Sequence, residues 1–172
     1  MKISQEFDAI VGIAREEAMR TGSYSIEADH LFLGILRHGG NAAVEALRSL
    51  GIDTAICKSE IDSRIFQKQG IPYDHEDEIR LGREGSNTVS LAIAEAISEG
   101  AEEAGAIHLL KAVFKQEKSH TGEYLRKRGI SIADLRSRPQ ARQKCSTEVK
   151  SGDIAILLSA ITLNTNKNNI VS

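Results

Sequence analysis

Apolar residues recur along this chain at helical spacing. Phe7, Ile10 and Ala14 fall three to four positions apart, which places them on one face of an α-helix. Ser4 precedes this face, and serine is a residue type that caps the N-terminus of a helix. Gly22 stands where a left-handed residue commonly closes the C-terminus. The first segment is therefore predicted to be a helix between Ser4 and Gly22.

Further helices follow from the same combination of apolar spacing, capping residues and glycine stops. They are predicted over residues 30–36, 41–50, 53–69, 86–100, 107–114 and 119–128, with a shorter one after Ser131. Asp29 is expected to cap the helix over 30–36, which is apolar nearly all round. No segment shows the sustained alternation or the hairpin turn pairs that predict strands. The pattern therefore predicts an all-α protein.

The predicted helices repeat. Shifting the chain by 78 residues pairs positions 11–55 with 89–133 without a gap, and 14 of the 45 pairs are identical. The identical pairs include His30 with His108 and Gly51 with Gly129. A repeated supersecondary unit buries its apolar face against a neighbouring copy. We therefore predict two tandem four-helix repeats related by pseudo-twofold symmetry, which together form an eight-helix bundle.

The repeats define the predicted domain. Residues 1–138 are expected to form a double-repeat domain, with repeat one over 3–69 and repeat two over 81–138. A polar, acidic connector separates the two repeats. Residues 139–172 are expected to form a basic and polar C-terminal extension, in which residues 154–163 could add one more helix.

Composition and charge exclude several broad classes. The chain has 172 residues and a net charge of −2, so charge supplies no general attraction to nucleic acid or to an anionic membrane. The apolar run over 154–158 is too short to cross a bilayer. Cys57 and Cys145 lie far apart, and the N-terminus lacks an apolar signal core. We therefore expect a reduced, cytoplasmic chain with no membrane partner.

The sequence contains none of the short motifs that carry common catalytic chemistry. It has no phosphate-binding glycine loop, no zinc spacing of cysteine and histidine, and no nucleophile elbow. We therefore predict no catalytic residues, no metal ligands, no cofactor and no enzymatic activity. His30 and His108 are predicted to be structural, each making a local hydrogen bond at the start of a buried helix. Glu17 and Glu95 are expected to face solvent or to pair locally, and Cys57 to be a core residue.

Two charged features could bind a partner. Glu27 and Asp29 lie at the entrance to the helix over 30–36, beside its partially positive N-terminus. Capping would account for Asp29 alone but not for two acids together, so both are candidate ligand- or peptide-binding residues. The second feature is the basic stretch over 126–150, which could meet phosphates. It lacks the interleaved aromatic residues that are typical of nucleic-acid-binding segments. A helical nucleic-acid-associated regulatory protein is therefore the alternative interpretation and not the leading one.

Three sequence features, present in both repeats, resemble a known family. The features are Ala14, Glu17 and Ala18 in the first helix, the histidine-led apolar helix over 30–36, and Leu-Arg-Ser-Leu-Gly-Ile-Asp over 47–53. They are similar to the Clp amino-terminal domain, the double-repeat module at the front of Clp-type AAA+ unfoldases. The likeness covers about residues 3–138. It implies a pseudo-twofold bundle of eight helices without enzymatic activity.

The resemblance also implies a binding function. Such domains dock substrates or adaptor proteins and pass them to an ATPase ring coupled to a protease. In some members an acidic residue directly before the helix-leading histidine binds phosphoarginine, a degradation mark. Ala28-Asp29 stands where the family usually has Thr-Glu, and the residue that matches Asp29 in repeat two is the uncharged Ile107. The resemblance therefore implies a ligand site at one helix entrance only.

We accordingly predict a non-catalytic docking module of the Clp unfoldase/protease system, binding protein partners for regulated proteolysis or chaperoning. The expected partners are Clp ATPase or protease subunits, adaptor proteins, or substrate proteins, including phosphoarginine-marked ones. The sequence reaches Ser172 without a nucleotide-binding module, and its asparagine-rich end favours a stand-alone adaptor-like protein over a piece of a longer chain. Replacing Asp29 by alanine is expected to weaken binding of phosphoarginine or Arg-rich peptides without unfolding the domain.

Overall fold

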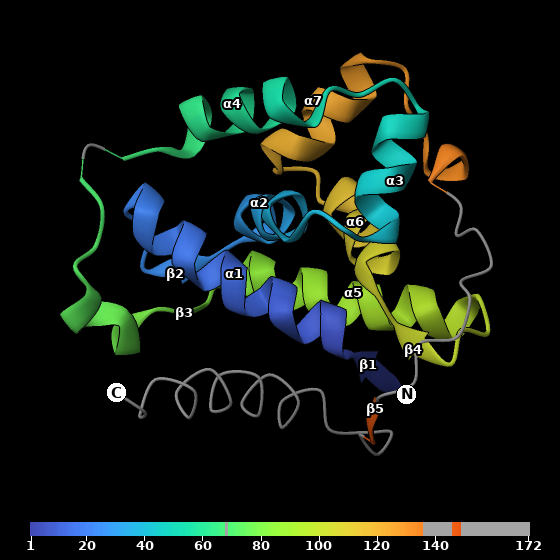
Figure 1. Ribbon diagram of the computed structural model, residues 1–172, viewed down its shortest axis with the longest axis horizontal. Helices are drawn as coiled ribbons and strands as arrows, with labels where there is room; N and C mark the ends of the chain where they lie inside the picture. The colour runs from blue at the N-terminus through green and yellow to red at the C-terminus, as the bar shows by residue number, and fades with distance from the viewer. Residues whose placement is uncertain (68, 136–145, 149–172) are drawn as a thin grey trace.

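Helices carry most of the molecule. The computed structural model describes residues 1–67, 69–135 and 146–148, and within them seven α-helices and two short 3₁₀ helices (Figure 1). The α-helices are α1 (Gln5–Thr21), α2 (Ala28–His38), α3 (Ala42–Ser49), α4 (Thr54–Ile65), α5 (Arg83–Ser98), α6 (Ala106–Lys115) and α7 (His120–Lys127). The 3₁₀ helices are η1 (Tyr73–Glu78) and η2 (Ile132–Asp134). The predicted all-α class is confirmed.

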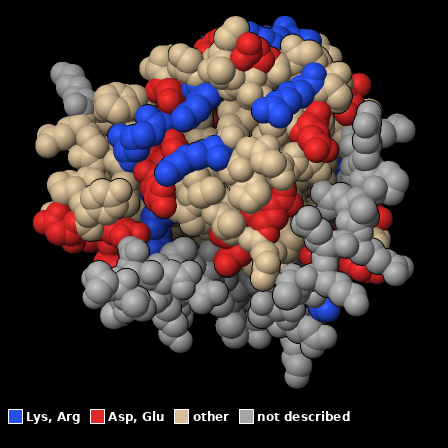
Figure 2. Space-filling model, in the orientation of Figure 1, with Lys and Arg blue, Asp and Glu red and all other residues tan. Residues whose placement is uncertain are grey.

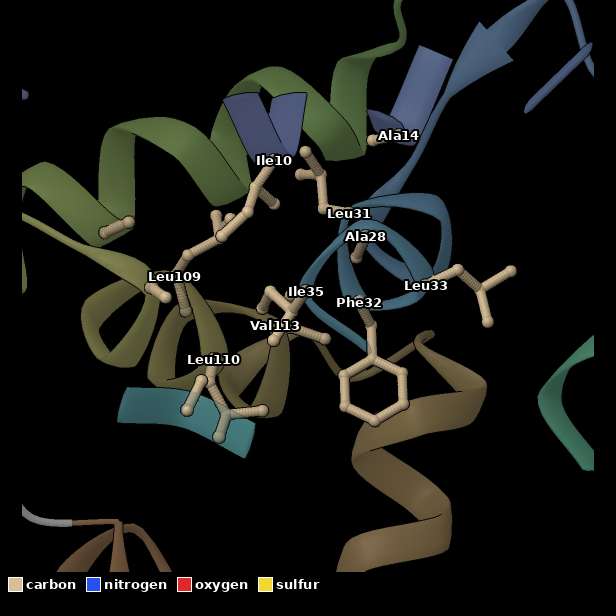
Figure 3. Packing of buried hydrophobic residues seen from close by; sticks show 14 of the residues in the cluster. Ile10, Ala14, Ala28, Leu31, Phe32, Leu33, Ile35, Leu109, Leu110 and Val113 are labelled. Carbon is tan, nitrogen blue, oxygen red and sulfur yellow. The ribbon is translucent and has the colours of Figure 1, made fainter. Parts of the chain in front are cut away.

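Helix α2 lies at the centre of the molecule (Figure 1). It packs against α1 of its own repeat and against α6 and α7 of the other repeat. Leu31, Phe32 and Ile35 have no exposed surface. Figure 3 shows Ile35 beside Val113 of α6, within the shared core. The helix is apolar nearly all round because neighbouring helices cover it on several sides.

Most predicted helix ends are those of the structure. The Ser4 hydroxyl accepts the N–H of Phe7 at 3.1 Å and so caps α1. Gly51 and Gly129 follow α3 and α7 with φ of 79° and 74°. This left-handed conformation is one that glycine adopts without strain. The repeated glycines therefore stop equivalent helices in the two repeats, as predicted.

Several boundaries differ from the predictions. Glu27 is the N-cap of α2, so the prediction that Asp29 caps its own helix is wrong. Helix α5 begins at Arg83, earlier than predicted, because an acid from another segment caps it, as described below. Helix α4 ends at Ile65 rather than near residue 70, since the following residues bind the C-terminal end of α1. The last helix of repeat two is only the 3₁₀ turn η2.

Short strands connect the repeats, and the expectation that the chain has no strands is wrong. β1 (Lys2–Ser4) pairs in parallel with β4 (Glu103–Ala104), and β2 (Ser25–Ile26) pairs in parallel with β3 (Arg80–Leu81). β5 (Ser146–Glu148) pairs with β1 in antiparallel orientation. Strands of two or three residues are too short to show alternation, and their partners lie far along the chain. No local pattern therefore predicts them.

The two parallel ladders relate the repeats by the expected twofold exchange. Lys2 pairs with Glu103, and Arg80 pairs with Ser25. Adding 78 to Lys2 gives Arg80, whereas subtracting 78 from Glu103 gives Ser25. Each repeat thus lends the other a strand partner, and each ladder joins one repeat to the other.

Ion pairs also join the repeats at the surface. Arg64 of α4 lies 3.4 Å from Glu123 of α7, and Glu60 of α4 lies 3.9 Å from Arg128, which follows α7. Figure 2 shows the molecule in the orientation of Figure 1. Basic and acidic side chains are interleaved over the upper part of the visible face, where Figure 1 places α4 and α7. Within the described ranges, no helix is long and apolar enough to span a membrane.

The predicted boundary between the domain and its extension lies outside the described residues. The same holds for the possible helix over 154–163 and for Cys145. The division into residues 1–138 and 139–172 therefore stays a prediction.

Candidate functional site

The candidate ligand residues lie where α2 begins. We call Glu27, Asp29 and His30 the α2 entrance. Glu27 is half-buried, whereas Asp29 and His30 are 7% and 5% exposed. The preceding strand β2 pairs with β3, which leads directly into α5, and α2 itself packs against α7. The N-termini of two helices of repeat two are therefore brought to the α2 entrance.

Asp29 caps α7. Its Oδ1 accepts the hydroxyl of Ser119 at 2.7 Å, the N–H of Thr121 at 2.9 Å and the hydroxyl of Thr121 at 2.8 Å. Its Oδ2 accepts the N–H of His120 at 3.1 Å. Ser119 and Thr121 are 1% and 0% exposed, so water does not readily reach these donors and the Asp29 carboxylate serves as their acceptor. The carboxylate is thus fully engaged in holding the first turn of α7.

Glu27 caps α5. Its Oε2 accepts the N–H of Gly85, the third residue of that helix, at 2.8 Å. Gly82 is the N-cap residue and has no side chain to satisfy this donor. A Cβ at Gly82 would lie 1.8 Å from Oε1 of Glu27, so the carboxylate occupies the space that a side chain would need. Helix α5 can start at a glycine because an acid of repeat one supplies its cap.

The two cross-repeat caps explain why two acids stand together. Each carboxylate meets the partially positive N-terminus of a helix in the other repeat, where a negative charge is stabilising. Asp29 and Ser119 are 90 positions apart, and Glu27 and Gly85 are 58 apart. Neither of these partners belongs to the helix that directly follows the acids, so no local pattern in the sequence points to them. The ligand-binding role of Glu27 and Asp29 stays a prediction.

Glu84 adds a third carboxylate that sequence reasoning missed. It lies in the first turn of α5. Burial raises its pKa, and the negative charges of Asp29 and Glu27 raise it further. An acid in the first turn of a helix is a recognisable signal, but the predicted helix began after Glu84. The three carboxylates together make the region around the α2 entrance suited to a cationic group.

His30 and His108 make equivalent local hydrogen bonds. Nδ1 of His30 accepts the N–H of Glu27 at 3.0 Å, and Nδ1 of His108 accepts the N–H of Gly105 at 3.0 Å. In a neutral ring, an accepting Nδ1 leaves the proton on Nε2. Nε2 of His30 lies 3.1 Å from the hydroxyl of Thr21 and can donate to it. Both rings thus make the expected local hydrogen bonds, and the structural role of the two histidines stays a prediction.

Acid is expected to destabilise the fold through these two rings. Burial lowers the pKa of His30 and of His108 below the ordinary value of 6.5, against smaller opposing effects of Asp29 and Glu99 respectively. The unfolded chain therefore takes up protons first, and the free energy of unfolding falls as the pH drops below about 6.5, until the folded-state pKa values are passed. Urea unfolding at several pH values measures this slope. The H30Q/H108Q variant is expected to lose part of it, and an unchanged slope would contradict the assignment.

Glu17 and Glu95 each pair with a basic residue of the following helix. Glu17 is 2% exposed and lies 2.6 Å from Arg20 and 3.4 Å from Arg37 of α2. In repeat two Glu95 pairs with Lys115 of α6, the equivalent of Arg37. The expectation of pairing holds, whereas exposure to solvent does not hold for Glu17. These carboxylates join α1 to α2 and α5 to α6.

Known proteins share this repeat and this fold. A family model described as the Clp repeat (R) N-terminal domain matches residues 2–128. The chain is 24% identical over 135 residues to the negative regulator of genetic competence ClpC/MecB of Bacillus subtilis (strain 168), covering 78% of this chain and 16% of that protein. It is 28% identical over 128 residues to an ATP-dependent Clp protease ATP-binding subunit ClpA homolog of Cyanidium caldarium, covering 74% and 15%. The chain thus spans about one sixth of the length of these relatives.

Solved structures support the fold. The Hsp104 N-terminal domain from Candida albicans matches with a TM-score of 0.62 and 12% identity, covering 78% of this chain and 87% of that one. The N-terminal domain of the chaperone ClpD from Arabidopsis thaliana matches with a TM-score of 0.59 and 13% identity, covering 77% and 91%. With the duplicated helices, the cross-repeat caps and the family match over residues 2–128, this chain belongs to the Clp repeat N-terminal domain family.

Proposed function

We propose that this chain is a non-catalytic docking module of the Clp unfoldase/protease system, which binds protein partners for regulated proteolysis or chaperoning. The observation that carries the proposal is the family match over residues 2–128, since the relatives that share it are Clp ATPases and chaperones. The partners are Clp ATPase or protease subunits, adaptor proteins, or substrate proteins.

The described residues hold neither a metal-ligand cluster nor, at Cys57, a reactive thiol. No group of three or more histidine, cysteine and acidic residues within them could hold a metal ion. Cys57 has no exposed surface, and burial raises the pKa of its thiol to about 12. A thiol that remains protonated near neutral pH is a poor nucleophile. Cys57 therefore serves as a small core residue.

The α2 entrance supports a partner that offers a cationic group. Asp29, Glu27 and Glu84 lie close enough for their charges to affect one another. A guanidinium carries several N–H donors, which is the chemistry needed to replace the donors that Asp29 now accepts. Binding of an arginine or phosphoarginine group at Asp29 would then compete with its cap on α7. We propose that the cationic group of such a ligand binds at Glu84 and on the solvent-facing side of Glu27 and Asp29.

The described part of the basic stretch favours protein docking over the nucleic-acid alternative. Arg126 donates to the carbonyl of Phe114 at 2.9 Å, and Lys127 lies 2.6 Å from Glu123. Arg128 stacks on the ring of Tyr124 with its guanidinium carbon 3.5 Å from the ring centroid. Each of these cations thus has a partner within the protein.

Co-purification tests the proposed function. The tagged chain is expected to recover a Clp ATPase or protease subunit from an extract of its own cells, and to hydrolyse no ATP by itself. The Glu84→Gln variant removes a charge near the α2 entrance and keeps a side-chain oxygen that can accept the backbone N–H of Ala28, so it should recover less of a partner that docks there. Glu102→Gln changes an exposed acid outside the α2 entrance and should leave recovery unchanged. Recovery of no Clp component by the unvaried chain would overturn the proposal.

A further inference from the structure

The two parallel ladders occupy equivalent places in the two repeats. β1 pairs with β4, and β3 pairs with β2, with every paired position shifted by 78 residues. Lys2 and Ile3 of β1 therefore correspond to Arg80 and Leu81 of β3. The outer edges of β1 and β3 are therefore equivalent positions of the backbone.

The outer edge of β1, which is the edge that faces away from β4, is already paired with a strand. β5 lies along it in antiparallel orientation, with Lys2 opposite Glu148 and Ile3 opposite Thr147. The resulting sheet has the order β4-β1-β5. The edge of β1 thus pairs with an extended segment that comes from a distant part of the chain.

The outer edge of β3 has the same backbone polarity. Arg80 and Gly82 donate their N–H groups to the carbonyls of Tyr24 and Ile26, at 3.1 and 3.0 Å. Successive residues of a strand direct their backbone groups to opposite edges, so the N–H and C=O of Leu81 point away from β2. No strand among the described residues pairs with this side of β3. Such a row of backbone groups is a template for strand addition.

We propose that the outer edge of β3 binds an extended segment of a protein partner, which adds as an antiparallel strand and places an acidic residue opposite Arg80. In strand addition the backbone hydrogen bonds supply affinity, and the side chains opposite the edge supply specificity. At the equivalent position of β1, the strand register pairs Lys2 with Glu148. Residues of opposite charge at paired positions of two strands are in general stabilising. The proposal rests on the proposed docking function and names the kind of segment that docks.

The side chain of Arg80 is held next to the strand. It is exposed, and its Nη1 donates to the carbonyls of Ile79, at 3.1 Å, and Asp77. These bonds anchor one end of the guanidinium to the chain that leads into β3. Its other N–H groups supply the positive charge that an acidic residue on the incoming strand would meet.

A peptide titration tests the inference. The probe is the peptide Lys-Ser-Ser-Thr-Glu-Val-Lys, the sequence of residues 144–150 with serine in place of Cys145, because this sequence already fits the equivalent edge. Added to the full ¹⁵N-labelled chain, it is expected to shift the amide resonance of Leu81 and its neighbours. Arg80→Glu should weaken binding about two- to five-fold, and a peptide with lysine in place of its glutamate should restore binding to that variant. Arg83→Glu, an equal change of charge three positions further along, should leave binding unchanged.

Three results would overturn the inference. They are the absence of any shift at millimolar peptide, shifts confined to β1 and β5, and shifts of Leu81 that grow with protein concentration without peptide. The last result would assign the edge to a second copy of this chain. If the peptide causes no shift while the chain still co-purifies with a Clp component, strand addition alone is overturned. Loss of co-purification by the unvaried chain overturns the docking function instead, so the two failures are distinguishable.

Discussion

Replacing Asp29 by alanine is expected to lower the free energy of unfolding by about 2–4 kcal/mol, more than the loss of an ordinary helix cap. The change leaves the hydroxyls of Ser119 and Thr121 and two backbone N–H groups of α7 without their acceptor. Ser119 and Thr121 are buried, so water cannot easily replace the carboxylate. Equilibrium urea unfolding, followed by far-ultraviolet circular dichroism, measures the loss.

Asp53 provides a matched control for this prediction. It is an exposed N-cap that accepts the N–H groups of Ala55 and Ile56 in its own helix, at 2.9 and 3.1 Å. Asp53→Ala is expected to cost about 0.5–2 kcal/mol. A cost for Asp29→Ala no greater than that would show that the cross-repeat contact adds nothing. The comparison also bears on ligand binding, because a loss of affinity in the Asp29 variant must be separated from its loss of stability.

The Gly85→Ala substitution is expected to destabilise the protein by about 1–3 kcal/mol through overpacking. A Cβ at Gly85 would lie 2.0 Å from the carbonyl oxygen of Ile26, a backbone atom of β2 that cannot rotate away. The substitution would also push α5 from Glu27, whose carboxylate accepts the Gly85 N–H. In the absence of a clash, alanine in place of glycine inside a helix would stabilise it by about 1 kcal/mol. The expected sign is therefore opposite to that of helix propensity.

Gly40→Ala is the control for Gly85→Ala. Gly40 has no heavy atom within 4 Å of the position that a Cβ would take, and its φ is not positive. Its substitution is expected to change the free energy of unfolding by no more than about 0.5 kcal/mol. The same urea unfolding measurement applies to both variants. A Gly85 variant as stable as the unvaried chain would mean that β2 and α5 do not approach as closely as the structure shows.

Local patterns in the sequence predict most of the helices well because most helix ends depend on neighbouring residues. Ser4 and Asn41 cap the helices that follow them, and Gly51 and Gly129 end the helices that precede them. The 78-residue repeat adds the expectation of two related halves. These features depend on residues within one turn of each other or on direct comparison of the two repeats, so they need no knowledge of the fold.

The start of α5 cannot be predicted from local sequence patterns. Nothing next to Gly82 identifies it as an N-cap, because the capping carboxylate belongs to Glu27 in the other repeat. The strands are not predicted from the sequence for the same reason, since Lys2 pairs with Glu103 only when the two repeats are assembled. A pattern that depends on a residue far along the chain leaves no periodic signal at either end.

By itself the sequence determined the all-α class, the two repeats and the buried central helix. Only the tertiary structure decided that Glu27 and Asp29 also cap helices of the other repeat, because the N-termini of α5 and α7 lie far from them along the chain. The physical reason is that an N-terminus needs an acceptor in space, not in sequence. Twofold exchange of the repeats brings that acceptor from 58 and 90 positions away.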